Sequence, residues 1–326
     1  MTHLARLLIV LLLLTGAAQA KEPTAEVAAT RAELDAGLAA IQIVDSGKVF
    51  LWKVTSKKKK HKGEVWLTGS VHLGLKDMYP LAAPIARAFE GADALVVEAD
   101  LAAPGAEKDA AAKMMEIARL PEGQTLSSLL PERADEIKAI LAPYMIPMVV
   151  ADTLKPFMVS MMLSLLELQW AGWDPALGID RHFLDQARGA KEIVELESAA
   201  MQVQIFADLD MEVQVAMLNA SLDFHGYANQ WTTLAWEAIA AGDTAALLAL
   251  AELEGSGADD PALEAFNTAL LDTRNVGMAD LIVKHITKGE GTWFVVVGAL
   301  HVPGDKGLLD LLDDRRFLKL EQQARE

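Results

Sequence analysis

Residues 65–74, VWLTGSVHLG, and residues 294–304, FVVVGALHVPG, repeat one arrangement near opposite ends of the chain. Each begins as a hydrophobic run rich in β-branched residues, which predicts a buried strand. Each run then ends in a glycine, two further residues and a histidine, which is His72 in the first stretch and His301 in the second. We expect the first glycine to let the chain turn as it leaves the sheet, and the glycine that follows each histidine to leave room for a substrate.

Two further hydrophobic runs end in glutamate residues. Glu98 ends the run LVVE, and Glu195 and Glu197 end the run IVELE. Strands that alternate with helices favour an α/β fold with a mixed, largely parallel central sheet flanked by helices. Ligands of such sheets bind beyond the carboxyl ends of the strands. We therefore expect His72, Glu98 and His301 to converge at one edge of the sheet, with Glu197 as a further contributor.

The middle of the chain predicts helices. From about residue 103 to residue 254, apolar residues recur mostly with a helical period. We expect this helical middle region to lie over the carboxyl ends of the strands, as a lid or as a substrate groove. The segment GSGADDP, residues 255–261, is the clearest linker, and a long helix follows it. Residues 21–326 are expected to form a single α/β domain.

Residues 1–20, MTHLARLLIVLLLLTGAAQA, have the plan of a secretory signal peptide. Arg6 precedes an apolar core that is too short to cross a bilayer comfortably, and an A-x-A cleavage site ends at Ala20. We expect a mature chain that begins near Lys21 and is periplasmic or secreted. The alternative is a membrane anchor, but no long apolar stretch follows, so no membrane span is expected after removal of the signal.

The composition excludes several classes of function. With 29 basic and 46 acidic residues, the formal net charge is −17, which predicts repulsion of nucleic acid and anionic membranes and tolerance of cationic peptides or metal ions. The chain contains no cysteine, so it has neither disulfides nor thiolate metal sites. The lysine run SKKKKHKG, residues 56–63, is either an anion-binding patch or, as we favour, a solvated turn between two strands.

The predicted convergence has a chemical meaning. Two neutral imidazoles and a carboxylate are a common ligand set for a divalent metal with open coordination positions. We therefore predict that His72, His301 and Glu98 bind such a metal, with Glu98 acting as a ligand or as the general base. Arg274 and Asn275 precede the last strong strand, and they are candidates for stabilising an oxyanion.

Several segments, in the same order, make the sequence similar to the TraB/GumN family. They include LTGSVHLG, LVVEAD, LGIDRHFL, VELES, TRNVGMADLI and VVVGALHVPGDKGLL, and the likeness extends over residues 51–312. That family is similar to the Tiki metalloproteases and, more distantly, to the erythromycin esterases and the ChaN-like haem-binding proteins. The resemblance implies that His72, His301 and Glu98 form the metal and catalytic centre. An arginine before the second G-x-x-H motif is typical of the family, and Arg274 matches it.

The Tiki reaction is metal-dependent peptide cleavage supported by manganese or cobalt. The resemblance therefore implies an exported metal-dependent peptidase that uses manganese, cobalt or zinc and acts on a peptide or protein. Two alternatives stay open. In the esterase relatives a similar constellation is read as metal-independent acid–base hydrolysis, and a non-catalytic periplasmic protein could use the same site to bind a peptide, a metal or haem. The sequence does not set the oligomeric state.

Overall fold

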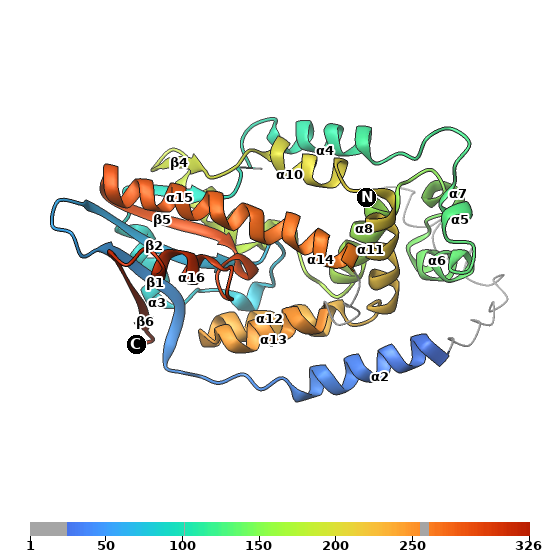
Figure 1. Cartoon of the computed structure of the whole chain (residues 1–326), viewed down its shortest axis with the longest axis horizontal. Coiled ribbons are helices and arrows are strands. Elements are labelled where there is room, and N and C mark those ends of the chain that lie inside the picture. Colours follow the sequence, from blue (N-terminus) through green and yellow to red (C-terminus); the bar gives the residue numbers. More distant parts are fainter. Residues whose placement is uncertain (1–24, 101, 255–260) are drawn as a thin grey trace, which may run out of the picture.

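A central sheet of six strands organises the chain (Figure 1). The computed structural model describes residues 25–100, 102–254 and 261–326. The predicted signal peptide and most of the predicted linker therefore lie outside the described residues. The strands are β1 (Lys48–Ser56), β2 (Lys62–Ser70), β3 (Ala94–Val97), β4 (Glu192–Glu195), β5 (Glu290–Gly298) and β6 (Leu318–Ala324).

The sheet is mixed, as predicted. Its strand order is β4-β3-β5-β2-β1-β6. The first four strands of this order are parallel, whereas β1 is antiparallel to both β2 and β6. Strand β5 comes late in the chain but lies between β2 and β3, with Ser70 of β2 opposite Gly298 of β5. The two strands that carry the G-x-x-H motifs are therefore neighbours, and their carboxyl ends lie at the same edge.

Helices cover both faces of the sheet and extend beyond it (Figure 1). The α-helices are α2 (Ala25–Ala40), α3 (Ala83–Glu90), α4 (Ala106–Ile117), α5 (Leu126–Leu129), α6 (Ala134–Leu141), α7 (Met148–Ala151), α8 (Pro156–Trp170), α9 (Ile179–Ala187), α10 (Ala199–Ala207), α11 (Met211–Asp223), α12 (Ala228–Ala241), α13 (Thr244–Glu254), α14 (Pro261–Asn267), α15 (Thr273–Lys288) and α16 (Leu308–Asp313). A π-helical turn, Thr268–Asp272, joins α14 to α15.

The two faces of the sheet bury alternate residues, as the two-residue period of a strand requires. Phe50 and Trp52 pack into a core with α12, α13, α15 and α16. Val49 and Leu51 of the same strand pack on the opposite face, with α3 and α9. The central strand β5, with the sequence EGTWFVVVG, consists largely of β-branched and aromatic residues, which suit a strand that is buried on both faces.

A separate apolar cluster holds the helical middle region together. It contains buried residues of α5, α6, α7, α8 and α11, including Leu126, Ile137 and Leu163. Figure 1 shows these helices beyond the carboxyl ends of the strands, where the helical middle region was expected. Helices α5 and α6 are separate because Pro131, which lies between them, cannot donate the backbone hydrogen bond of a continuing helix. Among the described helices, none combines the length and the apolar character that a membrane crossing requires.

Candidate active site

Four strand ends contribute side chains to one place. His72 follows β2, Glu98 follows β3, Glu197 follows β4 and His301 follows β5. Gly298 lies at the centre: a side-chain carbon added there would be 3.2 Å from Oε1 of Glu98, 3.4 Å from Cδ2 of His301 and 4.0 Å from Nε2 of His72. The structure therefore brings both histidines and Glu98 around one small space, which the missing side chain of Gly298 leaves open.

Glu98 is the most heavily bonded member of the group. Its side chain is 9% exposed, and its Oε1 accepts a hydrogen bond of 2.5 Å from the backbone N–H of Gly298. Oε1 also lies 3.6 Å from Nε2 of His301. Oε2 accepts hydrogen bonds from Nη2 of Arg274 at 2.5 Å and from Nε2 of Gln202 at 3.1 Å. Gln202 lies on α10, and nothing in the sequence pattern marked it as part of the site.

These contacts keep Glu98 ionised. Burial on its own would raise the pKa of the carboxyl group. Electrostatic interactions with His301, His72 and Arg274, together with the hydrogen bond from the N–H of Gly298, outweigh burial and lower the pKa of Glu98 below its usual value. Glu98 is therefore a carboxylate at neutral pH, as a metal ligand or a general base must be.

Arg274 joins Glu98 to Glu197. Nε of Arg274 lies 2.9 Å from both carboxylate oxygens of Glu197, and Nη2 lies 2.7 Å from Oε2. Nη1 donates to the carbonyl oxygen of Leu270, at 2.8 Å, in the π-helical turn that precedes Arg274. Within the described part of the chain, one N–H of the guanidinium group, on Nη1, has no acceptor. The contacts of Arg274 therefore serve mainly the two buried carboxylates.

His301 is buried, with 5% of its side chain exposed. Its Nδ1 lies 2.6 Å from Oδ1 of Asn275, and Nδ2 of Asn275 donates to the carbonyl oxygen of Lys306 at 2.8 Å. Because the amide of Asn275 is oriented by this second bond, its oxygen faces the ring, so Nδ1 carries the hydrogen and Nε2 is left with its lone pair. Burial lowers the pKa of His301 to about 4, so the ring is neutral at physiological pH.

His72 is held in a different way. Its side chain is 63% exposed, and its Nδ1 lies 3.1 Å from Oδ2 of Asp180, at the start of α9. The hydrogen bond with Asp180 raises the pKa of His72 to about 9. The sequence gives no signal for Asp180, because a single aspartate on a predicted helix has no spacing that points to a distant strand end.

The loop after β2 is fixed to the segment that leads into α9. Gly74 and Asp174 exchange backbone hydrogen bonds of 3.0 and 2.9 Å. A side-chain carbon on Gly74 would lie 1.9 Å from the carbonyl oxygen of Leu177. The expectation that this glycine leaves room for a substrate is therefore wrong: it leaves room for the backbone that places Asp180 beside His72.

The match of this chain to a known protein family covers both G-x-x-H motifs and the region between them. The model of the TraB/PrgY/gumN family matches residues 50–318, which include every residue of the site described above. The chain belongs to this family. It is 26% identical over 251 residues to the uncharacterized protein YbaP of Escherichia coli strain K12, and the match covers 76% of this chain and 86% of YbaP. YbaP of Shigella flexneri matches equally well. No solved structure matches the chain.

In this TraB/PrgY/gumN protein, the side chains gathered at the strand ends are of types that divalent metals bind, and both imidazoles are oriented by an oxygen. Each imidazole has its Nδ1 held by an oxygen, from Asp180 for His72 and from Asn275 for His301, which is how proteins orient histidines that bind a metal through Nε2. Within the described residues, no group of three or more histidine or acidic side chains has the spacing of a formed metal site. The exposed side chain of His72 is the one that would have to move closer.

We expect Asp180→Asn to lower the pKa of His72 from about 9 towards 6.5, because the hydrogen bond with Asp180 is the main cause that raises it. A group whose pKa is raised by folding stabilises the protein at pH values below its pKa in the unfolded chain. This stabilisation is lost as the pH rises through its pKa in the folded protein. The stability difference between wild type and variant should therefore be present below about pH 6.5 and fade above about pH 9. NMR titration of the histidines in metal-free protein measures the shift.

Asp185→Asn is the matched control, because Asp185 lies on the same helix but pairs with Arg181, at 2.9 Å. A pKa of His72 that is the same in both variants would contradict the assigned contact.

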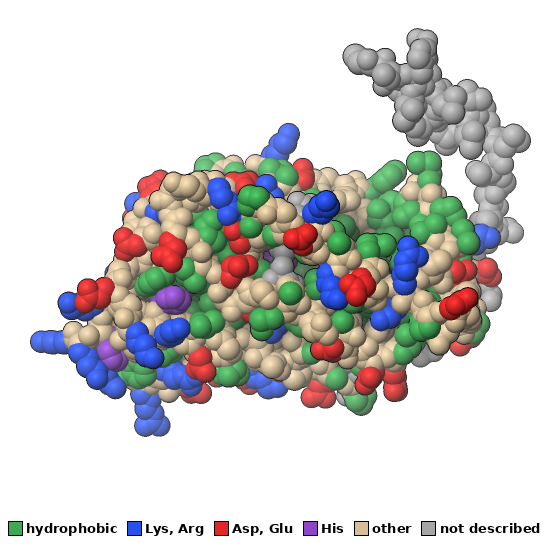
Figure 2. Space-filling view, turned by 90° about the horizontal axis from the view of Figure 1, so that it is seen from above, with side chains coloured by type: hydrophobic (Ala, Val, Ile, Leu, Met, Phe, Trp, Pro, Cys, Tyr) green, Lys and Arg blue, Asp and Glu red, His purple; other side chains and the backbone are tan. Residues whose placement is uncertain are grey.

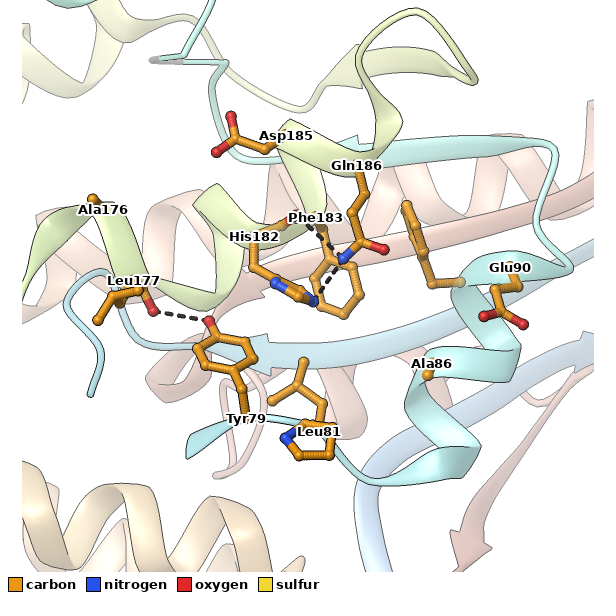
Figure 3. A pocket seen from close by; sticks show the side chains of 12 residues that line it. Tyr79, Leu81, Ala86, Glu90, Ala176, Leu177, His182, Phe183, Asp185 and Gln186 are labelled. Carbon is orange, nitrogen blue, oxygen red and sulfur yellow. Dashed lines mark hydrogen bonds between the residues drawn. The ribbon is translucent and has the colours of Figure 1, made fainter. Parts of the chain in front are cut away.

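A pocket of about 650 Å³ lies beside this site, between α3 and α9 (Figure 3). In its wall the hydroxyl of Tyr79 donates to the carbonyl oxygen of Leu177 at 2.8 Å, and Nε2 of His182 lies 2.6 Å from Nε2 of Gln186. None of the predicted site residues lines this pocket. It shares helix α9 and the segment around Leu177 with the site.

Proposed function

We propose that this TraB/PrgY/gumN protein is an exported hydrolase, and that it is a metal-dependent peptidase. The observation that carries the proposal is the convergence of His72, Glu98 and His301 around Gly298. A peptide or protein is the expected substrate, and export rests on the signal-like segment at residues 1–20.

His72, His301 and Glu98 would hold the metal, for which manganese, cobalt or zinc is suitable. When bound, such an ion lowers the pKa of a coordinated water and polarises a carbonyl group. The exposed face of His72 is the open side of the site, since His301 and Glu98 are both buried. A substrate would therefore approach over His72.

The residues of the chain supply charge and orientation. Glu98 is placed to accept a proton, and Arg274 keeps it ionised and fixes the direction of its Oε2. Glu197 in turn holds Arg274 through three contacts of 2.7 to 2.9 Å. The remaining N–H of Arg274 is available for the oxyanion role that its position in the sequence implies, and Asn275 acts on the ring of His301 rather than on a substrate.

Metal-independent ester hydrolysis is the second candidate, and one observation favours it. The environments of the two histidines move their pKa values apart, to about 9 for His72 and about 4 for His301. At neutral pH one ring is then a proton donor and the other is a proton acceptor, which is the usual division of labour in acid–base catalysis. This candidate uses the same residues but predicts that chelators have no effect.

Metal analysis and a peptide-library assay test the proposal together. We expect the purified protein to bind a divalent metal and to cleave peptides, and a chelator to stop cleavage until manganese is restored. His72→Ala and His301→Ala should each lose both the bound metal, measured by calorimetry, and the activity. His285→Ala is a suitable control, since His285 lies on α15 against Trp293, with ring centres 4.2 Å apart.

The other outcomes separate the candidates. Hydrolysis of esters that chelators do not affect would establish the metal-independent reaction. Binding of a peptide, a metal or haem that His72→Ala abolishes, without cleavage of any library member, would establish the non-catalytic binding protein.

A further inference from the structure

Two segments that are far apart in the sequence form a cationic surface, here called the basic tip. The backbone N–H of Lys57 donates to the carbonyl oxygen of Phe317 at 2.8 Å, and its Nζ donates to that of Arg316 at 3.1 Å. Nζ of Lys58 lies 4.8 Å from the centre of the Phe317 ring, and His61 packs against the same ring at 5.7 Å. The basic tip consists of Lys57, Lys58, Lys59, Lys60, Lys62, Arg316 and Lys319.

Most of these charges are not neutralised locally. Lys62 pairs with Glu290 at 3.2 Å, and Lys319 pairs with Glu321 at 2.8 Å. Within the described residues, the other five cations of the basic tip form no ion pair with an acidic side chain, although Asp313 and Asp314 lie nearby in the sequence. A chain with a formal net charge of −17 therefore carries a concentrated positive end.

The basic tip lies opposite the candidate active site. The turn between β1 and β2 is at the amino end of β2, whereas His72 follows its carboxyl end. The nine residues of β2 span roughly 30 Å at the usual rise of a strand. Figure 1 shows this turn at one end of the molecule, and Figure 2 shows Lys and Arg side chains gathered at that end.

We propose that the basic tip docks the protein onto the surface of an anionic phospholipid bilayer, with the candidate active site facing away from it. Charge complementarity carries the proposal. Lysine clusters near a membrane surface are attracted by the combined potential of anionic headgroups and need no fixed geometry. All the unpaired cations of the turn are lysines, whereas specific phosphate recognition favours the planar fork of arginine.

The negative charge of the whole chain does not prevent this contact. At physiological ionic strength, charges are screened over about 8 Å. The acidic residues at the far end of the sheet are several such lengths away from a bilayer that touches the turn, so the nearby lysines dominate.

Nucleic acid fits the basic tip less well than a bilayer does. Non-specific binding of single strands uses a groove with aromatic rings on which bases stack. The aromatic ring at the basic tip belongs to Phe317, and Lys58 and His61 already pack against it. The turn at the end of a hairpin also offers a point of contact rather than a track.

Vesicle flotation tests the docking surface. The protein without its first 20 residues, which keeps every described element, is mixed with phosphatidylcholine vesicles that contain either no anionic lipid or about one third phosphatidylglycerol. We expect binding to the anionic vesicles alone, and we expect it to weaken between about 50 mM and about 300 mM salt.

Lys59→Gln/Lys60→Gln/Arg316→Gln removes three exposed cations whose side chains form no hydrogen bond or ion pair with the described part of the chain. Each cation near the surface strengthens binding about fivefold, so this variant should bind about a hundredfold more weakly. Lys76→Gln/Lys108→Gln/Lys138→Gln is the matched control, because it changes the net charge equally at other exposed positions.

The proposal is overturned if wild type does not bind anionic vesicles at low salt, if zwitterionic vesicles bind equally well, or if the control variant loses as much affinity. Binding to a DNA oligonucleotide but not to vesicles would assign the basic tip to nucleic acid instead. None of these results depends on whether the protein is a hydrolase.

Discussion

Glu98→Gln is expected to lower the rate of hydrolysis by a factor of roughly 10² to 10⁴, the usual contribution of a general base. The change keeps the size of the side chain but removes its charge and most of its basicity. It also puts an N–H₂ group where the structure has an acceptor, since both oxygens of Glu98 receive hydrogen bonds, from Gly298 and from Arg274. Steady-state kinetics on any cleaved substrate measures the loss.

Glu195→Gln is the control for this prediction. Glu195 also lies at the end of a strand, but among the described residues its Oε1 accepts a hydrogen bond from the backbone N–H of Asp100 alone, at 2.8 Å, a contact that an amide oxygen preserves. Circular dichroism should show a folded protein for both variants. An activity of Glu98→Gln close to that of Glu195→Gln would remove Glu98 from the reaction.

The fold class and the family follow from the sequence because they depend on local patterns. Runs of β-branched residues, separated by helical periods, predict strands and helices that largely hold in the structure. The family is recognisable because its most specific signals are the two G-x-x-H motifs, and each of them is a short, unbroken segment of the sequence. Strand β6 was not predicted, since its sequence LKLEQQA is mostly polar and its pairing with β1 depends on tertiary context.

The candidate site divides in the same way. His72, Glu98 and His301 each end a hydrophobic run, so a parallel sheet alone predicts that they meet. Asp180 and Gln202 lie on helices, where a single polar residue gives no such signal. The position of β5 between β2 and β3 also depends on tertiary structure and could not be predicted from the sequence. Because of this position, the two motifs are neighbours and are not separated by another strand.

Arg274 was predicted as an oxyanion donor from its place before the second motif. Its contacts show a further role in the fold, which no sequence pattern indicates. It is the counter-charge of two carboxylates whose side chains are 9% and 8% exposed. One group on α15 and two groups that follow β3 and β4 therefore depend on one another, and this dependence is visible only in the folded chain.

Arg274→Ala is therefore expected to lower the free energy of unfolding at neutral pH by about 3–5 kcal/mol, the usual effect of breaking a buried ion pair and leaving its partner unpaired. Here Glu98 and Glu197 would both lose their guanidinium partner. We also expect a lower kcat, because the direction and the ionisation of Glu98 would no longer be fixed. Arg274→Lys keeps a positive charge but not the bidentate contact, so it should recover part of the stability.

The dependence on pH separates this electrostatic effect from lost packing. The pKa of Glu98 is lowered in the folded wild type, so its interaction with Arg274 stabilises the protein above the unfolded pKa and is lost as the pH falls through the folded value. Without Arg274 the buried carboxyl group titrates at a higher pH and becomes neutral sooner. The difference in unfolding free energy between wild type and Arg274→Ala should therefore shrink as the pH is lowered towards about 4. Denaturant unfolding at several pH values measures it, and a difference that stays constant would mean that Arg274 stabilises the fold through the packing of its aliphatic stem instead.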